Sequence, residues 1–367
     1  MNVNGVRERT LTETPDGRAV SIVDQTLLPD RFEHLRLEDI AATASAISRM
    51  SVRGAPLIGI AAAYGLALGL RDDASDAGLD RAIKLLISTR PTAVNLRWAL
   101  ESVRAEVAPL PESQRFSEAW ATAGRMAEED VAACQAIGRH GAVLLESLQQ
   151  PRRDGGRLNI LTHCNAGWLA AIDVGTALAP VYFLHDAGVP VHVWVSETRP
   201  RNQGLLTAWE LGAHGVPFTL IVDNAAGSIL QSGRVDACIV GTDRVTRNGH
   251  VCNKIGTLLK ALAADDAGVP FYVAAPSASI DWTLSDSALI PIEERSAEEV
   301  RGNANTPVLN PGFDVTPGHL VTALITEYGV CPATEEGLAS LVPEARLKEE
   351  KLLTPVPPES TAASRWK

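Results

Sequence analysis

Five short apolar runs in the second half of the chain place the strongest constraint on how this sequence can fold. Each is four or five residues long, and helical patterns separate most of them. Strands that alternate with helices predict a parallel sheet, because each parallel strand needs a crossover connection. The runs occupy 158–161, 191–195, 218–222, 237–240 and 271–274, with helices expected over 166–187, 205–214, 227–232, 255–267 and 320–328. We therefore predict an α/β fold with a Rossmann-like, doubly wound parallel sheet.

The first 150 residues follow a different pattern. Apolar residues flank a turn signal at 15–18, which predicts a β-hairpin over 10–28. The Ala-rich sequence that follows predicts helices over 37–50, 59–70, 80–88, 94–107 and 117–148. The polar segment 151–157 contains Pro and Gly and marks a boundary. We predict a hairpin and helical domain over 1–150, a catalytic domain over 151–345 and a disordered tail over 346–367.

Charge and cysteine usage narrow the class of function. The net charge of −11 argues against general binding to nucleic acid. The five cysteines are scattered without C-x-x-C spacing, which favours reduced thiols over a disulfide framework or a zinc site. No secretory signal is visible in the first seven residues, and the apolar stretch 57–70 is too short to span a bilayer. We expect a cytoplasmic protein without membrane or nucleic-acid partners.

Two of the predicted strands end in groups that can transfer protons. Cys164 follows the first apolar run and Asp243 follows the fourth. Parallel sheets bind ligands just beyond the carboxyl ends of their strands, and a thiol ahead of a helix ionises more readily. The alternatives are that Cys164 is a small buried hydrophobe and that Asp243 caps a helix or pairs with Arg244. His163 is expected to be a packing residue, because adjacent strand residues face opposite ways.

Four polar loops bring cationic side chains into this otherwise acidic protein. Arg53 precedes Gly54 at a helix start, where free backbone amides can bind phosphate. The alternative there is an ordinary loop with Pro near the start of a helix. Any one such loop can be an ordinary solvated loop, but the four together predict a binding site for a sugar phosphate. The loops span 52–56, 89–96, 197–204 and 253–257.

Taken together, these segments resemble the methylthioribose-1-phosphate isomerases, which are relatives of the regulatory subunits of a eukaryotic translation initiation exchange factor. The likeness runs in one order over about residues 15–335. The matches read VRGAP at 52–56, RPTAVNL at 90–96, THCNAG at 162–167, LTAWEL at 206–211 and NKIGT at 253–257. Residues 197–200, 203–204, 241, 243–244, 274–277, 290–295 and 313–317 also match.

The resemblance implies roles for individual residues. Cys164 and Asp243 match the two catalytic positions, with Asp243 the usual proton donor. Seven further positions match substrate-binding residues of the family, namely Arg53, Gly54, Ala55, Arg90, Gln203, Asn253 and Lys254. No metal and no nicotinamide is implied, and no G-x-G-x-x-G follows a strand. Relatives suggest a homodimer.

The implied reaction is an aldose–ketose isomerisation in methionine salvage, from 5-methylthioribose 1-phosphate to 5-methylthioribulose 1-phosphate. Protonated Asp243 would assist ring opening, and Cys164 as a thiolate would carry the C2 proton to C1. A direct hydride shift is the rival route. Alternative functions are the same chemistry on 5-deoxyribose 1-phosphate or ribose 1,5-bisphosphate, and a non-catalytic subunit that senses sugar phosphate or nucleotide. Retention of both Cys164 and Asp243 favours the enzyme.

The sequence departs from the family pattern at two places. Family members usually carry one or two more residues, often including an Arg, between Gln203-Gly204 and the LTAWEL run. Thr242 replaces the Ala that usually precedes Asp243. The shorter loop lies beside an expected substrate contact, so we expect some breadth in the substituent at the 5-position of the sugar.

Overall fold

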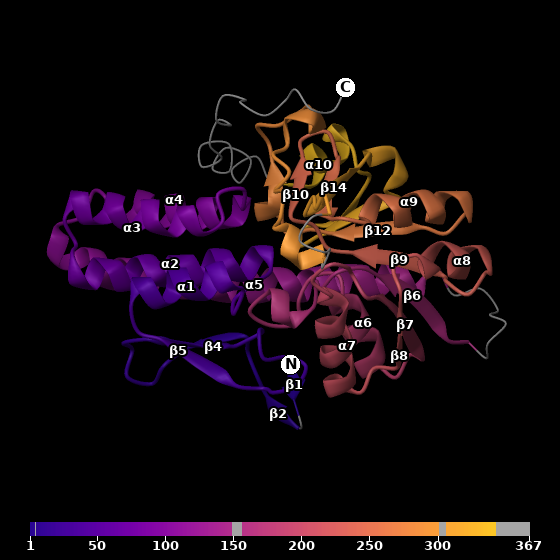
Figure 1. Ribbon diagram of the computed structural model, residues 1–367, viewed down its shortest axis with the longest axis horizontal. Coiled ribbons are helices and arrows are strands. Elements are labelled where there is room, and N and C mark those ends of the chain that lie inside the picture. The colour runs from indigo at the N-terminus through magenta and orange to yellow at the C-terminus, as the bar shows by residue number, and fades with distance from the viewer. Residues whose placement is uncertain (4, 149–155, 301–305, 343–367) are drawn as a thin grey trace.

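The computed structural model describes residues 1–3, 5–148, 156–300 and 306–342. Within them, a helical part and a large β-sheet lie side by side, and a small N-terminal sheet lies under the helices (Figure 1). None of the helices in these ranges is long and apolar enough to cross a membrane. The predicted α/β fold is confirmed, and the predicted tail over 346–367 lies outside the described ranges.

The predicted hairpin is confirmed and gains a third strand. Strands β3 (Leu11–Glu13) and β4 (Val20–Val23) pair antiparallel around the turn at 15–18. Strand β5 (His34–Leu37) then pairs with the other side of β4. The predicted helix over 37–50 begins on the last residue of β5, and the residues of β5 alternate in burial as on a half-covered sheet. A separate pair is formed by β1 (Asn2–Val3) and β2 (Val6–Arg7).

Five helices form the N-terminal core. The central one, α2, is apolar on nearly every side and packs against the other four, which explains why its sequence lacks a polar face. The 35-residue helix α5 packs on α2 and α4 and also on α6 and β15 of the second half. The helices are α1 (Ile40–Arg49), α2 (Ala55–Asp72), α3 (Asp76–Thr89), α4 (Val94–Val107) and α5 (Glu112–Glu146).

The second half is built on a seven-stranded sheet in the order β16-β15-β12-β9-β6-β7-β8. All neighbours are parallel except β16, which is antiparallel to β15. The strands are β6 (Leu158–Thr162), β7 (Val191–Ser196), β8 (Phe218–Ile221), β9 (Ala237–Val240), β12 (Phe271–Ala274), β15 (Ala323–Thr326) and β16 (Gly329–Cys331). Its helices are α6 (Ala179–Asp186), α7 (Gln203–His214), α8 (Ala225–Gln231), α9 (Thr257–Asp266) and α10 (Glu335–Leu341).

A second, four-stranded sheet stands beside the first and was not foreseen from the sequence. Its order is β13-β10-β11-β14, and the hairpin of β10 and β11 leaves the main sheet directly after β9. The strands are β10 (Arg244–Thr246), β11 (Val251–Lys254), β13 (Ile280–Asp281) and β14 (Phe313–Thr316). Short 3-10 helices complete the described chain at η1 (Trp168–Ala170), η2 (Ser277–Ser279), η3 (Ser287–Leu289), η4 (Ala297–Val300) and η5 (Gly318–Leu320).

Two helix predictions were wrong. The predicted helix over 166–187 is mostly a loop, with η1 near its start and α6 at its end. The chain turns back on itself there, because Gly167 bridges to Gly175 and Val174 has a positive φ of 64°. The predicted helix over 320–328 is instead the end of η5 followed by strand β15. Both segments are apolar runs, which periodicity alone cannot assign to a helix or a buried strand.

The predicted domain boundary near residue 150 remains a proposal. Residues 151–155 of the polar segment that suggested it lie outside the described ranges. Helix α5 packs against both halves and is continuous up to Glu146, so the two parts share this helix.

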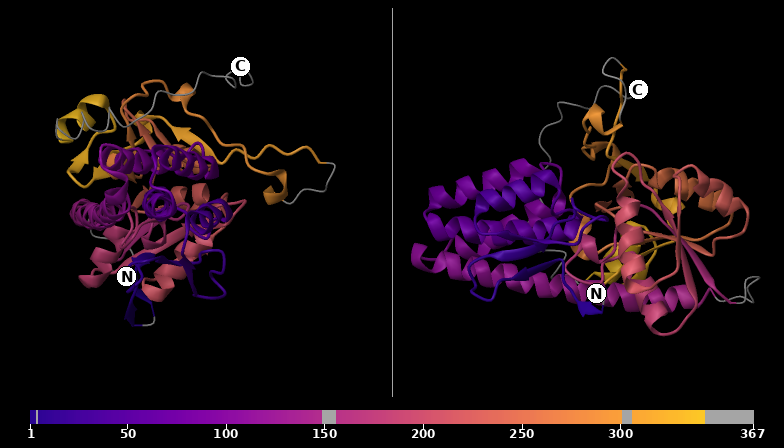
Figure 2. Two further views of the ribbon diagram at one scale, coloured as in Figure 1. Left: turned by 90° about the vertical axis from the view of Figure 1, so that its left-hand side faces the viewer. Right: turned by 60° about the horizontal axis from the view of Figure 1, so that its bottom comes forward.

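Figure 2 shows a further feature, an arm of residues 291–300 and 306–312 that runs out from the body and back. Its two sides are joined by hydrogen bonds from Arg295 N to Asn310 O and from Gly312 N to Glu293 O, both 2.8 Å.

A partly buried carboxylate on α5 makes the stability of this fold depend on pH. Asp130 accepts a hydrogen bond of 2.9 Å from the amide of Ile172, and burial, helped by Glu327 and Asp173, raises its pKa from 3.8 to about 7. The folded state therefore keeps a proton that the unfolded state loses, so unfolding becomes easier as the pH rises between those two values. We expect the thermal midpoint to fall between pH 4 and pH 7.

The Asp130→Asn variant should show a shallower fall in thermal midpoint across the same range. A residual slope should remain, because burial also raises the pKa of Asp314 to about 6. Thermal unfolding followed by circular dichroism at several pH values measures both slopes. Parallel curves for the variant and the wild type would show that Asp130 does not hold its proton in the folded protein.

Candidate active site

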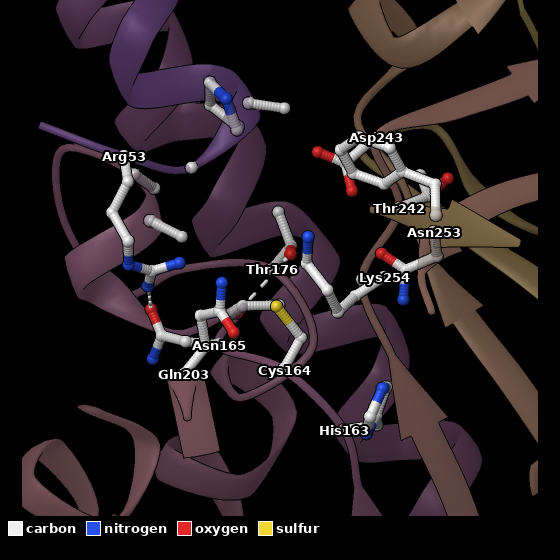
Figure 3. A pocket seen from close by; sticks show the side chains of 18 of the residues that line it. Arg53, His163, Cys164, Asn165, Thr176, Gln203, Thr242, Asp243, Asn253 and Lys254 are labelled. Atoms are coloured by element: carbon white, nitrogen blue, oxygen red, sulfur yellow. Dashed lines mark hydrogen bonds between the residues drawn. The ribbon is translucent and has the colours of Figure 1, made fainter. Parts of the chain in front are cut away.

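The strand order of the main sheet reverses between β6 and β9. From β6 the chain continues outward through β7 and β8, and it then returns to the other side of β6 to form β9, β12 and β15. A crevice opens at such a reversal, outside the carboxyl ends of the two central strands. Cys164 lies two residues beyond β6 and Asp243 lies three residues beyond β9. Both face the same cavity (Figure 3).

The cavity gathers all nine residues that the sequence analysis assigned to the site. The helical part supplies Arg53, Gly54, Ala55 and Arg90, and the sheets and their loops supply Cys164, Gln203, Asp243, Asn253 and Lys254. The individual roles of these residues stay predictions. Sequence reasoning missed the remaining lining residues, which are Met50, Pro56, His163, Asn165, Ala166, Ala170, Ala171, Thr176, Gly241, Thr242 and Phe313. Six of these eleven lie within two residues of a predicted site residue in sequence, which was the available signal.

Cys164 occupies an unusual backbone conformation that holds its side chain in the cavity. Its φ is 66°, in the left-handed region that non-glycine residues seldom adopt. Its amide donates to Thr198 Oγ1 at 2.8 Å, and its carbonyl accepts from Thr207 Oγ1 at 2.8 Å. The thiol does not begin a helix, so the predicted assistance from a helix dipole is wrong. Burial raises the pKa of Cys164 and so favours the thiol, although Lys254 and Arg53 oppose that rise.

Asp243 sits in the link between the two sheets. A strand, not a helix, follows it, so the cap alternative fails, and Arg244 pairs instead with Asp281 at 2.9 Å. The amide of Asp243 donates to Cys252 O at 3.1 Å on the neighbouring strand β11. Burial raises the pKa of the Asp243 carboxyl, and the cations Lys254, Arg90 and Arg53 oppose that rise. A proton on this carboxyl is thus easier to keep than on an exposed aspartate.

Three cations converge on the cavity from different elements. Arg53 is 9% exposed and donates from Nη2 to Asn165 Oδ1. Lys254 Nζ donates to Gly312 O at 2.9 Å and lies 4.3 Å from the centre of the Phe313 ring. Lys254 is the largest opposing charge for both Cys164 and Asp243, and Figure 3 shows its side chain reaching between them. Arg90 Nη2 is 3.4 Å from a carboxylate oxygen of Glu293.

Gly54 cannot be replaced without moving the chain. Its φ is 98°, and a Cβ atom there would collide with the backbone of Ala170. This close approach lets the start of α2 reach the cavity, which Gly54, Ala55 and Pro56 line. The first amides of an α-helix have no partner within the helix, and they favour anions. The local sequence therefore places free helix amides next to the Arg53 guanidinium, an arrangement that favours an anion.

Several polar atoms at the cavity lack a hydrogen-bond partner within the described parts of the chain. They are Nε of Arg53, Nε of Arg90 and Oε1 of Gln203. Buried polar groups are normally paired, so unpaired ones at a cavity indicate that a polar ligand completes them. Two of the three are donors on cations, which matches an anion. The third is an acceptor, which matches a hydroxyl group.

His163 lines the cavity but is neutral. Burial lowers its pKa to about 3. Its Nε2 lies 2.8 Å from Ile255 O and therefore carries the proton, which leaves Nδ1 as an acceptor facing Thr198 Oγ1 at 3.3 Å. The ring supports the Thr198 side chain that holds the Cys164 amide. The expectation that His163 faces away from Cys164 is wrong, because both residues line the same cavity, and its packing role stays a prediction.

The fold and this cavity define a class of protein. It is an α/β protein with a cation-lined cavity at the switch point of a doubly wound sheet, between that sheet and a helical part, where such proteins commonly bind small ligands. The family described as the Initiation factor 2 subunit family matches residues 51–333, and the chain belongs to this family.

Relatives of known name cover nearly the whole chain. A protein of Methylobacterium nodulans named methylthioribose-1-phosphate isomerase is 59% identical over 364 residues, covering 94% of this chain and 99% of its own length. A protein of the same name from Rhodospirillum rubrum is 54% identical and covers 99% of this chain and 97% of its own length. The predicted resemblance to these isomerases is confirmed.

Solved structures show the same fold. The 5-methylthioribose 1-phosphate isomerase of Pyrococcus horikoshii OT3 superposes with a TM-score of 0.81 at 40% identity, covering 91% of this chain and 96% of that one. The delta subunit of translation initiation factor eIF-2B from A. fulgidus gives a TM-score of 0.75 at 37% identity, covering 94% of this chain and all of that one. Solved structures of both groups named in the predicted resemblance, the isomerases and the translation initiation factor subunits, are therefore similar to this chain.

Proposed function

We propose that this protein converts 5-methylthioribose 1-phosphate into 5-methylthioribulose 1-phosphate in methionine salvage. The observation that carries the proposal is the placement of Cys164 and Asp243 at adjacent strand ends, across one cavity that also holds three cations. Near-full-length relatives with that name, 54 to 59% identical, support the same substrate. A subunit that only sensed the sugar phosphate would need the cations but neither of the two acids.

The phosphate of the substrate binds on the helical side of the cavity. Arg53 and the amides that begin α2 hold its oxygens, with Arg90, Asn253 and Lys254 closing the site. No group of three His, Cys, Asp or Glu side chains within the described ranges is arranged to hold a metal. Binding of the phosphate is accordingly assigned to cationic side chains and backbone amides.

Asp243 starts the reaction, because the anomeric phosphate prevents simple ring opening. The protonated carboxyl donates to the ring oxygen as the C1–O bond breaks. Cys164 as a thiolate then takes the C2 proton and returns it to C1, and the proton of the 2-hydroxyl passes to the Asp243 carboxylate. Asp243 and Cys164 thus both return to their starting protonation states. Since burial favours the thiol, this route needs Lys254 to stabilise the thiolate. A hydride shift from C2 to C1 remains the rival route and needs no base at C2.

The remaining lining fits an apolar substituent at the 5-position. Met50, Ala170, Ala171 and Phe313 present apolar surface to the cavity. A methylthio or methyl group can be buried there without a polar partner, whereas a second phosphate needs further cations.

We propose that the protein works as a homodimer in the cytoplasm, which is what the resemblance to the isomerase family implies. Light scattering of the purified protein measures the oligomeric state.

The two acids are tested by conservative substitutions. Cys164→Ser and Asp243→Asn should each lower kcat at least ~10²-fold, because serine is a far weaker acid than a thiol and asparagine cannot donate the proton. Circular dichroism should show an unchanged fold. Cys331→Ser, far from the cavity on β16, is the matched control and should keep its activity. Turnover near wild type in Cys164→Ser would favour the hydride shift, and in Asp243→Asn it would remove that group from the mechanism.

The mode of phosphate binding is tested at Arg53. Arg53→Ala should raise KM about 10- to 150-fold, which corresponds to a charge-assisted hydrogen bond of about 1.5 to 3 kcal/mol. Arg139→Ala, an exposed arginine on α5, is the control and should leave KM unchanged. Activity should also survive a metal chelator. If a chelator abolished activity and a divalent ion restored it, the assignment of phosphate binding to Arg53 and the amides would be wrong.

Substrate specificity is tested with three sugar phosphates. Replacing methylthio by methyl should change kcat/KM only by roughly 10- to 200-fold, the usual range for apolar groups of similar size. Ribose 1,5-bisphosphate should be rejected much more strongly, because its second phosphate would be buried against apolar surface. Equal kcat/KM for the bisphosphate and the methylthio sugar would contradict the apolar pocket and assign the protein to bisphosphate isomerisation.

A further inference from the structure

A buried carboxylate lies directly behind the cavity and has no role in the reaction proposed above. Glu210 on α7 is 0% exposed. Its Oε1 accepts from Asn165 Nδ2 at 2.6 Å, and its Oε2 accepts from the amide of Leu169 at 3.3 Å. Burying a carboxylate is costly unless its oxygens are paired, so its position at this place needs a reason.

The partner that Glu210 holds is in turn the partner of Arg53. Asn165 is 5% exposed and lines the cavity. Its Nδ2 donates to Glu210 Oε1 and to Thr207 Oγ1, while its Oδ1 accepts from Arg53 Nη2. An ionised carboxylate can only accept, and it therefore fixes which end of the amide faces it. A reversed amide would set its NH2 group against the guanidinium donors of Arg53.

The loop after β6 is shaped around the same carboxylate. Gly167 lies so close to Glu210 that a Cβ atom on the glycine would collide with the carboxylate group. Asn165 and Leu169, on either side of it, both donate to that group. Thr207, one turn before Glu210 on α7, donates to the carbonyl of Cys164. Helix α7 thus fixes the loop that carries both Cys164 and Asn165.

We propose that Glu210 is a positioning residue for the anion site: through Asn165, it holds the Arg53 guanidinium in place at the cavity. The inference rests on the proposed function only for the identity of the anion, a sugar phosphate. Burial raises the pKa of Glu210 to about 8, and its hydrogen bonds and the Arg53 charge oppose that rise. Because Asn165 Nδ2 and the Leu169 amide both donate to its oxygens, the charged form is the one that the surroundings fit.

A double-mutant cycle tests whether Glu210 acts through Asn165. Glu210→Gln, Asn165→Ala and the combined variant are compared with the wild type. The readouts are KM and kcat for 5-methylthioribose 1-phosphate, and Kd for inorganic phosphate by calorimetry. Glu210→Gln keeps the shape but leaves one acceptor for two donors. It should raise KM and the phosphate Kd about tenfold or more, with kcat changed less than about threefold.

In the Asn165→Ala background, the Glu210→Gln change should add less than about twofold to KM and to the phosphate Kd, because the link is already broken. Equal effects in both backgrounds, or a loss confined to kcat, would overturn the proposal. Asp130→Asn, a partly buried acid changed to its amide outside the cavity lining, is the matched control and should leave both constants unchanged. If Glu210→Gln fails to fold, Glu210→Asp replaces it in the cycle, since it keeps the charge but loses reach, and the same non-additivity is required.

The phosphate measurement separates this proposal from the proposed function. A wild type that binds phosphate but does not turn over the sugar would refute the isomerase assignment, while the phosphate cycle would still decide the role of Glu210. If the wild type turns over the sugar but the variants in the cycle have additive effects, the isomerase assignment stands. The link from Glu210 through Asn165 to Arg53 would then be rejected.

Discussion

The reversal of strand order between β6 and β9 is the constraint on which the rest of the site depends. Two strands that pair side by side end at the same edge of the sheet, yet the chain leaves them in opposite directions. The space left between the diverging connections is the cavity. Cys164 and Asp243 are 79 residues apart in sequence and still face each other across it, because the sheet brings their strands together.

Charge balance follows from the burial that this crevice imposes. Burial raises the pKa of Cys164, Asp243 and Glu210, and it lowers the pKa of Arg53. The neighbouring cations oppose the rise in the pKa of each acid, and the acids oppose the fall in the pKa of Arg53. Neither sign can therefore be removed alone without leaving an uncompensated charge. A bound phosphate adds negative charge beside Arg53, which is the side where the unpaired guanidinium Nε lies. The site is therefore suited to an anion even before chemistry is considered.

The sequence predicted what local patterns encode and missed what only tertiary contacts decide. The five apolar runs became strands of one sheet. Four of them are the buried, continuous apolar segments typical of parallel strands, whereas β8 is an edge strand that exposes Phe218 and Leu220. The same reasoning mistook 320–328 for a helix, since β15 is equally apolar. It also missed β10 and β11, whose short polar hairpin carries no strong pattern. In the site, the motif residues were found, but the contacts of Cys164 with Thr198 and Thr207 join distant segments that no spacing in the sequence relates.

The arm of residues 291–300 and 306–312 shows how the two halves of the site are tied to each other (Figure 2). Its Gly312 carbonyl holds Lys254 from the second sheet, and its Glu293 carboxylate lies against Arg90 from the helical part. Two cations that enter the cavity from opposite sides are thus anchored on one segment. Any movement of the helical part relative to the sheets would change the distance between Arg90 and Lys254, so the arm links the geometry of the anion site to the packing of the two halves.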